Sequence, residues 1–331
     1  MKIEIDFIKR QMIMSAVNIF FWNSGVAPLE SSKPKKEDVN KVLAMAKKLF
    51  IEKGCDLLIL CEINSSVAAS LKYNLTGFNV IALMNKASTR SNFDMLAITK
   101  KYISVSDIYY LKLNNLSDEQ DKIENNEEFL PNSGRTMKVG VDMVVKIKNT
   151  TNSFHVIASH WSSKSNGYSE ENREESGDEL KEYVKTLVEG NRQVVLIGDY
   201  NDHPQSISIL KKLGATQNRH YASMDRKRIY NPSFSFYLPH QPYINGEFQH
   251  FHGTWLSRDE SIRRNNNLSC QVFDQVMVTS SFVKSGPWHL DEKNTKIVYD
   301  EHIMNLLYGG EIDHLPIMTK IEHLNQIEMR K

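Results

Sequence analysis

The sequence predicts an α/β protein in which two mixed β-sheets stack on each other and helices cover their outer faces. Two patterns lead to this fold class. Strand and helix patterns alternate in the first part of the chain, and several strand patterns then follow one another. The length of 331 residues also suffices for a large core. We expect residues 1–331 to form a single domain, because no internal repeat or low-complexity tail interrupts the pattern.

The first elements are a strand, a helix and a second strand. An apolar strand from Val17 to Trp22 runs into Asn23. Pro34 opens a helix pattern that Gly54 closes. Its apolar face consists of Val39, Val42, Leu43, Ala46, Leu49 and Phe50. The next strand, from Asp56 to Cys61, runs into Glu62. We expect the helix to pack against a sheet that contains both strands.

The middle of the chain contains a polar stretch, a strand and a second helix. Residues 114–134 are rich in Asn, Asp and Glu, which predicts a mobile acidic surface loop. The strand from Phe154 to Ser159 runs into His160. A helix is expected from about Asp178 to Glu189, with Gly190 as its stop. This helix leads the chain into the next strand.

The most informative segment is VVLIGDYND, from Val194 to Asp202. Its apolar residues predict a fully buried strand, and Gly198 is expected to let the backbone turn just before three polar side chains. Asp199 and Asn201 would share one face, at the carboxyl end where open α/β sheets usually place their chemistry. Ordinary turns can end in the same residues, so this segment leaves both interpretations open.

An apolar strand that ends in a polar residue is expected at two further places. Val272 and Phe273 precede Asp274, and Ile312 precedes Asp313 and His314. With the four strands above, the chain therefore repeats one pattern of carboxylates, amides and histidines, without cysteine, at apolar segment ends. Taken singly, each residue could be a turn former or a core histidine. Together they favour a hard divalent metal and phosphoryl chemistry rather than zinc.

Composition narrows the function less than the motifs do. The chain has 41 Lys plus Arg against 40 Asp plus Glu, so nucleic-acid affinity would have to come from a local patch. Two basic stretches, Arg226 to Arg228 and Arg263 to Asn267, could be solvated faces or could line a groove for a polyanion. Three cysteines suit a reducing compartment, and the apolar stretch Met12–Trp22, which contains Ser15 and Asn18, is too short and too polar for a membrane span. We expect a cytoplasmic protein.

The ordered motifs resemble those of the endonuclease/exonuclease/phosphatase superfamily, which has the DNase I-like fold. These motifs are WN at Trp22-Asn23, CE at Cys61-Glu62, SHW at Ser159–Trp161, GDYN at Gly198–Asn201, FDQ at Phe273–Gln275 and DH at Asp313-His314. The resemblance spans roughly residues 17 to 320 and implies a four-layer α/β/β/α sandwich. The segments HWSSK, IYNP, GTW and FDQVMV are also similar to a bacterial branch of nucleases and phosphodiesterases.

The resemblance also implies roles for the motif residues. Glu62 would be the main Mg²⁺ ligand, with Asn23 beside it and Asp313 in support; Mn²⁺ could replace Mg²⁺. Asp199 and Asn201 would orient the attacking water and the scissile phosphate. Asp274 would hold His314, which could act as a base or as a clamp on phosphate. The remaining roles are a charge-stabilising or proton-donating His160 and a phosphate-binding Arg135, which could instead be an ordinary surface residue at a loop exit.

Two departures weigh against a dedicated abasic-site repair enzyme. Gly25 stands where such enzymes typically carry a second acidic metal ligand, and Phe129 stands where they carry a catalytic tyrosine. The sequence therefore predicts a Mg²⁺-dependent phosphodiesterase, in the first place a nuclease that acts on DNA. A hydrolase of a small or lipid phosphodiester or phosphomonoester is the first alternative. An inactive nucleic-acid-binding module is the second, although the set of acidic and histidine residues is complete.

Overall fold

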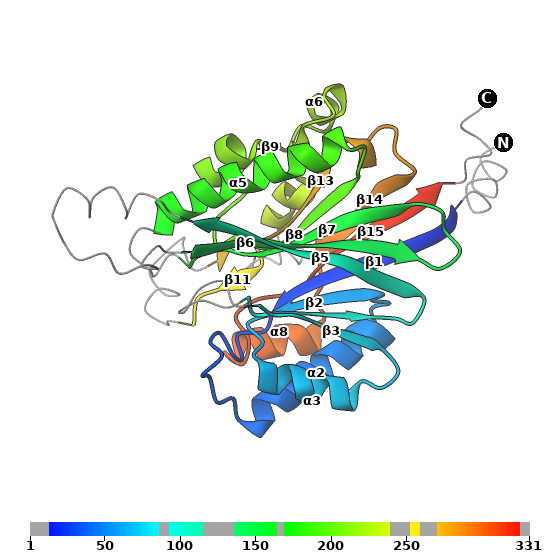
Figure 1. Ribbon diagram of the computed structural model, residues 1–331. Coiled ribbons are helices and arrows are strands. Elements are labelled where there is room, and N and C mark those ends of the chain that lie inside the picture. Colours follow the sequence, from blue (N-terminus) through cyan, green and yellow to red (C-terminus); the bar gives the residue numbers. More distant parts are fainter. Residues whose placement is uncertain are drawn as a thin grey trace, which may run out of the picture.

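The computed structural model describes residues 13–85, 93–114, 136–163, 169–238, 252–258 and 270–324. Two large mixed sheets lie face to face, with helices on both outer faces (Figure 1). The first sheet has the strand order β14-β15-β1-β2-β4-β3, and the second has the order β5-β6-β7-β8-β13-β10-β9. This arrangement confirms the predicted DNase I-like α/β sandwich.

Each sheet combines parallel and antiparallel pairs. In the first sheet β1 is parallel to β2, and in the second β7 is parallel to β8. The strands of the first sheet are β1 (Ile13–Asn23), β2 (Leu57–Cys61), β3 (Asn79–Leu83), β4 (Met95–Thr99), β14 (Trp288–Ile297) and β15 (Ile317–Leu324). Those of the second are β5 (Ile103–Asn114), β6 (Thr136–Ile147), β7 (Ser153–His160), β8 (Val194–Asp199), β9 (Ala215–Thr216), β10 (Ile229–Tyr230) and β13 (Asp274–Thr279). A small separate pair is formed by β11 (Trp255–Leu256) and β12 (Cys270–Gln271).

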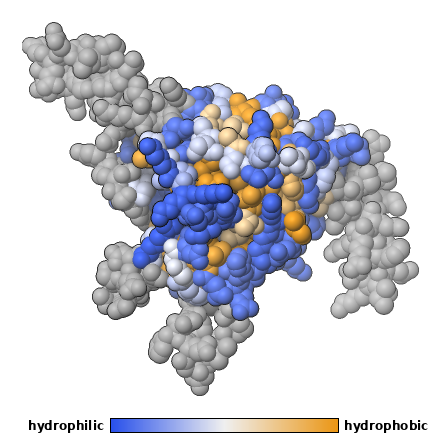
Figure 2. Space-filling model, turned by 90° about the horizontal axis from the view of Figure 1, so that it is seen from below, coloured by the Kyte–Doolittle hydropathy of each residue, from blue (hydrophilic) through white to orange (hydrophobic). Residues whose placement is uncertain are grey.

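Helices complete the outer layers. In Figure 1, α2 (Lys36–Ile51), α3 (Ser65–Asn74) and α8 (Glu301–Tyr308) lie on the side of the first sheet, and α5 (Ser169–Glu189) and α6 (Arg219–Met224) lie on the side of the second. Three short helical segments are η1 (Ser208–Leu213), η2 (Pro232–Tyr237) and η3 (Ser280–Phe282). Figure 2, seen from the side of α2, α3 and α8, shows a mixed surface of hydrophilic residues with hydrophobic residues exposed between them. Within the described residues, no helix is long and apolar enough to cross a membrane.

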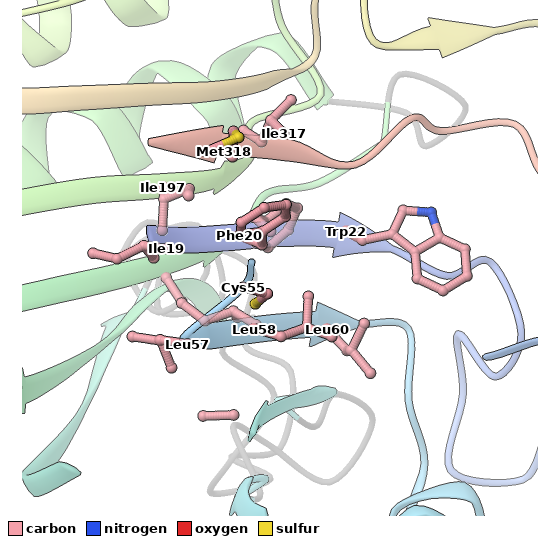
Figure 3. Close-up of a cluster of buried hydrophobic side chains, with 14 of the residues drawn as sticks. Ile19, Phe20, Trp22, Cys55, Leu57, Leu58, Leu60, Ile197, Ile317 and Met318 are labelled. Carbon is pink, nitrogen blue, oxygen red and sulfur yellow. The ribbon is translucent and has the colours of Figure 1, made fainter. Parts of the chain in front are cut away.

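The main core lies between the two sheets and continues under α2, α3 and α8. Figure 3 shows part of it, where Ile197 of β8 points toward Ile19 of β1. Because side chains alternate along a strand, the neighbouring Leu196 points the other way and packs with Val184 of α5 in a second apolar cluster. This alternation decides which side chains of the second sheet face the first.

The two predicted helices are present, with one boundary different. The helix between Pro34 and Gly54 is α2, and its predicted apolar residues are buried or packed against the core. The helix expected from Asp178 begins earlier, at Ser169. Its first turns are highly charged, so the apolar periodicity that marks a helix in the sequence starts only at Leu180. Of the predicted acidic loop 114–134, Asn114 ends β5, and the rest lies outside the described residues.

Candidate active site

Polar side chains from both sheets meet at one edge of the sandwich, which we call the polar edge. The strands β1, β2, β7 and β8 end there, at Asn23, Cys61, His160 and Asp199. The prediction that these apolar strands lead into polar residues is therefore confirmed. The polar edge comprises Asn23, Glu62, Asp94, Lys138, His160, Asp199, Asn201, Asp274, Asp313 and His314.

At two of the six places where a strand was predicted to end, a strand begins instead. Asp274 is the first residue of β13, where it pairs with Asp199 of the antiparallel β8. Asp313 and His314 precede β15, whose first residue, Ile317, pairs with Phe21 of the antiparallel β1. The prediction of strands ending at these residues is wrong. The residues still reach the polar edge because an antiparallel strand begins where its neighbour ends.

Strand alternation directs the key side chains of the second sheet into the space between the sheets. Val195 and Ile197 of β8 belong to the core between the sheets, so Asp199 lies on the same face. The same parity holds for Val276 and Asp274 on β13, and for Ala158 and His160 on β7. These three polar residues therefore lie on the core-facing sides of their strands, at the polar edge of the core.

Gly198 has a different role from the predicted one. It lies within β8 rather than at a turn, so that expectation is wrong. A Cβ atom at this position would lie 2.2 Å from the backbone oxygen of Ser159 in β7. Glycine thus allows a close approach between β7 and β8, and His160 pairs with Asp199 immediately beyond it.

Asn23 links the two sheets through two carboxylates. Its Nδ2 donates to Glu62 Oε1 at 3.2 Å and to Asp199 Oδ2 at 3.0 Å, while its Oδ1 accepts from the backbone N–H of Gly25 at 3.0 Å. Glu62 has a φ of 55°, a left-handed conformation that is uncommon for residues other than glycine. Such strain often marks functional sites, and here it accompanies a carboxylate that faces Asn23 and, at 3.7 Å, His160 Nε2.

The first of two histidine–aspartate pairs consists of His160 and Asp94. His160 Nδ1 lies 3.0 Å from Asp94 Oδ2, and Lys138 Nζ donates to Asp94 Oδ1 at 2.8 Å. Burial raises the pKa of Asp94, but His160 and Lys138 outweigh it and hold that pKa well below its usual 3.8. Burial also lowers the pKa of His160, but Asp94 outweighs this effect and raises it above 6.5. Asp94 is therefore ionised near neutral pH, and its carboxylate favours the protonated form of His160.

The second pair consists of His314 and Asp274. His314 Nδ1 lies 2.8 Å from Asp274 Oδ2, and its Nε2 lies 3.8 Å from Asp199 Oδ2. Burial lowers the pKa of His314, but the Asp274 and Asp199 carboxylates outweigh it and raise the pKa well above 6.5. Burial raises the pKa of Asp274, against the effect of His314, and Asp199 adds to the rise. The His314 imidazolium thus lies between two carboxylates.

A buried group of potential metal ligands lies around the second pair. One ligand atom each of Asp199, Asp274 and His314 lies within 4.8 Å of the others. Asp274 Oδ1 is buried and has no hydrogen-bond partner among the described residues. These donor types and this spacing could hold a metal ion.

Asp313 lies at the rim, near Gly25. Its Oδ1 is 3.2 Å from Arg258 Nη2, and a Cβ atom at Gly25 would lie 3.3 Å from the same Oδ1 and 3.2 Å from the same Nη2. Gly25 also has a φ of 63°. A side chain at position 25 would therefore be strained and would crowd the ion pair of Arg258 and Asp313.

Asn201 follows Asp199 in a left-handed conformation, with a φ of 50°. Its backbone N–H donates to Asp199 Oδ1 at 2.8 Å, and its Nδ2 donates to the backbone oxygen of Trp161 at 3.0 Å. Asn201 thereby helps to fix the Asp199 carboxylate. Arg135, the predicted phosphate-binding residue, lies outside the described residues, as does the basic stretch Arg263 to Asn267.

Asp94 and Lys138 were not among the residues predicted from the sequence. Asp94 directly precedes the apolar strand β4, so it shows the same pattern of a polar residue beside an apolar strand, but at the strand's beginning. Lys138 lies within β6, and no pattern in the neighbouring sequence marks it, because its partner Asp94 is 44 residues away.

Comparison with known protein families identifies the family. A sequence model described as the Endonuclease/Exonuclease/phosphatase family matches residues 135–323, which is more than half of the chain. The chain belongs to this family. The endonuclease/exonuclease/phosphatase name covers enzymes that hydrolyse phosphoester bonds, so this chain belongs to a family of hydrolases. The match includes His160, Asp199, Asp274 and His314, whereas Asn23, Glu62 and Asp94 precede it.

Solved structures share the fold at low sequence identity. An endonuclease/exonuclease/phosphatase family protein from Bacteroides thetaiotaomicron is 12% identical with a TM-score of 0.56, and the alignment covers 93% of this chain and 98% of that one. The catalytic domain of human Nocturnin, solved with a bound sulfate anion, is 12% identical with a TM-score of 0.54, over 93% of this chain and 94% of that one. Truncated TDP2 from Caenorhabditis elegans is 12% identical with a TM-score of 0.54, over 94% of this chain and 99% of that one. No curated protein sequence matches the chain.

Proposed function

We propose that this protein is a Mg²⁺-dependent phosphodiesterase that hydrolyses DNA, with the polar edge as its active site. One observation carries the proposal. Two histidine–aspartate pairs, each formed between the two sheets, direct their Nε2 atoms toward Glu62 and Asp199, the two carboxylates that Asn23 links. Cationic imidazoles beside paired carboxylates are suited to a reaction in which negative charge builds up on phosphate oxygens.

Glu62, Asn23 and Asp313 are the metal ligands in this proposal. The Glu62 and Asp313 side chains are 20% and 24% exposed, whereas those of Asp199 and Asp274 are 1% and 0% exposed. A hydrated ion can therefore reach Glu62 and Asp313 most easily, and carboxylate and amide oxygens suit Mg²⁺, with Mn²⁺ as an alternative. When bound, the metal would neutralise charge on the phosphate.

The buried group of Asp199, Asp274 and His314 fits proton and charge handling better than metal binding. His314 already shares its Nδ1 with Asp274, and its raised pKa makes it a cation, which disfavours a second cation beside it. We assign Asp199, fixed by Asn201 and Asn23, to orient the attacking water and accept its proton. His314 donates from Nε2 to a phosphate oxygen, held in this orientation by Asp274.

His160 acts from the other side of Glu62 in this proposal. Its Nδ1 is fixed by Asp94, so its Nε2 is available to stabilise charge or to protonate the leaving oxygen. Arg135 remains a prediction as a phosphate-binding residue. DNA as the substrate follows from the motif resemblance, and Nocturnin, which shares the fold, was solved with sulfate, a tetrahedral oxyanion like phosphate. We retain a cytoplasmic location as a prediction.

Cleavage of supercoiled plasmid by the purified protein tests the proposal. We expect nicking with Mg²⁺, none with EDTA, and none for Asp199→Ala. The matched control is Asp178→Ala, which removes an aspartate on α5 that pairs with Lys212 and is 52% exposed. This control should nick as well as the wild type.

Two results would contradict the proposal in different ways. Nicking that survives in Asp199→Ala would show that the polar edge does not carry the chemistry or that the preparation is contaminated. An intact plasmid together with hydrolysis of bis-p-nitrophenyl phosphate by the wild type would keep the phosphodiesterase chemistry and reject DNA as the substrate.

A further inference from the structure

A cavity lies at the other end of the second sheet from the polar edge. It has a volume of about 450 Å³ and lies where β8 begins and β13 ends, beside η3 and α6. We call it the basic pocket; its lining residues are Val188, Asn191, Arg192, Gln193, Ser223, Met224, Arg226, Ser280, Ser281, Lys284, Ser285, Gly286 and Pro287. Since β8 spans Val194 to Asp199, this pocket lies about 17 Å from the polar edge.

The lining of the basic pocket carries cations and no carboxylate. Arg192, Arg226 and Lys284 line it, and none of its lining residues is acidic. Arg226 Nη2 donates to the side-chain oxygen of Asn191 and, at 3.3 Å, to the backbone oxygen of Val188. Because both acceptors are neutral, these bonds position the guanidinium without neutralising it.

The acidic residues next to the pocket are paired with other cations. Glu189, which directly follows Val188, forms an ion pair with Lys227 at 2.8 Å. Asp225, which precedes Arg226, lies 3.8 Å from Arg228 Nε and accepts from the backbone N–H of Lys227 at 2.9 Å. Within the part of the chain that the structure describes, no ion pair involves Arg192 or Lys284. The positive charge of the pocket is therefore available to a ligand.

The floor of the pocket is fixed by Gln193. Its Nε2 donates to the backbone oxygen of Trp288 at 2.9 Å, and its Oε1 accepts from the backbone N–H of Trp288 at 3.1 Å. A Cβ atom at Gly286 would lie 2.1 Å from Gln193 Nε2, so the backbone at this position packs directly on the amide. Four serines, Ser223, Ser280, Ser281 and Ser285, also line the pocket. Ser223 Oγ donates to the backbone oxygen of His220 at 2.7 Å and Ser281 Oγ lies 3.3 Å from Thr279 Oγ1, so these two hydroxyl groups already have partners.

We propose that the basic pocket binds the phosphate group of a small phosphorylated molecule. Uncompensated cations with several hydroxyl groups match a compact oxyanion, and the volume falls in the range of small-molecule sites. The lining contains no aromatic residue, so it lacks the stacking surfaces on which single-stranded nucleic acids depend. The occupant is therefore a phosphomonoester such as a sugar phosphate or a mononucleotide, and not a nucleic-acid strand.

Calorimetric titration with ribose 5-phosphate, adenosine 5′-monophosphate, inorganic phosphate and ribose tests this site. EDTA is present throughout, so metal-dependent binding at the polar edge does not contribute. We expect the three phosphates to bind and ribose not to bind. Tighter binding of adenosine 5′-monophosphate than of ribose 5-phosphate would identify a nucleotide as the source of the phosphate, and equal binding a sugar phosphate.

The variants locate the binding. The double variant Arg192→Gln/Lys284→Gln removes the positive charges of two exposed side chains and should weaken phosphate binding by about tenfold or more. The matched control Lys36→Gln/Lys72→Gln removes the same charge from exposed positions on α2 and α3 and should bind as the wild type does. Equal binding of ribose and ribose 5-phosphate, no binding of any phosphate, or binding that is lost in His314→Ala but kept in Arg192→Gln/Lys284→Gln would overturn the proposal.

Discussion

The two histidine–aspartate pairs of the polar edge have nearly the same geometry and different surroundings. In each pair the Nδ1 atom contacts an aspartate of the other sheet, at 3.0 Å for His160 and at 2.8 Å for His314. In each, the Nε2 atom lies just beyond hydrogen-bond distance of a carboxylate, 3.7 Å from Glu62 and 3.8 Å from Asp199. The two sheets thus contribute one histidine and one aspartate each.

The difference between the pairs is a single lysine. Lys138 contacts Asp94, so that carboxylate has two cationic partners and its pKa is lowered. Among the described residues, His314 is the one cationic partner of Asp274, and burial together with nearby Asp199 raises the pKa of Asp274. In the first pair, Lys138 and His160 together balance the negative charge of Asp94, so the carboxylate mainly holds His160 in place. In the second pair, the His314 imidazolium faces the negative charges of both Asp274 and Asp199. We therefore expect the His314 pair to matter more for the reaction and the His160 pair to matter more for stability.

The largest effect is expected from Asp274→Asn. An amide keeps the shape of the side chain but cannot stabilise the imidazolium of His314, and loss of such a carboxylate can cost on the order of 10⁴-fold in kcat. We expect a loss of that order, measured as kcat for bis-p-nitrophenyl phosphate with Mg²⁺.

A third buried pair provides the control. His155 Nδ1 contacts Asp142 Oδ2 at 2.9 Å on the outer face of the second sheet, where Tyr183 of α5 also donates to Asp142 at 2.8 Å. Asp142→Asn should lower stability and leave kcat unchanged. If Asp274→Asn and Asp142→Asn reduce kcat alike, the effect is structural and the role assigned to His314 is wrong.

The second effect concerns stability and its pH dependence. Asp94 has a lowered pKa in the folded state, so its ionised form stabilises the fold at pH values above its unfolded pKa of about 3.9, and this contribution is lost as the pH falls through the folded pKa. Removing one partner of a buried ion pair typically costs about 3 kcal/mol or more. We expect Asp94→Asn to lose that much free energy of unfolding at neutral pH, in urea titrations with EDTA, and the gap to the wild type to narrow below about pH 4. A gap that is constant between pH 7 and pH 3 would contradict the role of the Asp94 charge.

The third-largest effect is expected on the kcat of Asp94→Asn. Glu62 still faces His160 in this variant, so part of its positioning remains, and we expect kcat to fall by about 10- to 100-fold, up to the lower limit of what a positioned acid or base contributes. The comparison with Asp274→Asn is made with the same substrate. Equal losses would mean that Lys138 does not distinguish the two pairs.

The predictability of these two pairs from the sequence differs. His314, Asp274 and His160 are flanked by apolar segments and belong to motifs, so local patterns were enough to select them. Their strand direction was not predictable, because an apolar run has the same composition in parallel and antiparallel pairing; this is why Asp274 and Asp313 were expected at strand ends.

Asp94 and Lys138 could not be found in the same way. The contact of His160 with Asp94 joins residues 66 positions apart and on different sheets. Such a contact depends on how the sheets stack, which no local pattern reports. The layers, the helix α2 and the strand ends at Asn23, Cys61, His160 and Asp199 were predictable, whereas the contacts of His160 with Asp94 and of Asp94 with Lys138 were not.

The smallest effect is expected from Lys138→Met, which makes the first pair resemble the second. Lys138 is 2.8 Å from Asp94, but its side chain is 21% exposed, so water screens the ion pair and its contribution is of the order of a surface pair, about 0.7 kcal/mol. If that energy acts on the reaction through His160, kcat should fall by about threefold. Methionine keeps the length of the side chain and removes only the charge.

Lys146→Met, at an exposed position of the same strand, controls for the change of charge and should leave kcat unchanged. A loss as large as that of Asp94→Asn would mean that Lys138 contacts the substrate itself, and the difference between the two pairs would then come from substrate binding rather than from charge compensation.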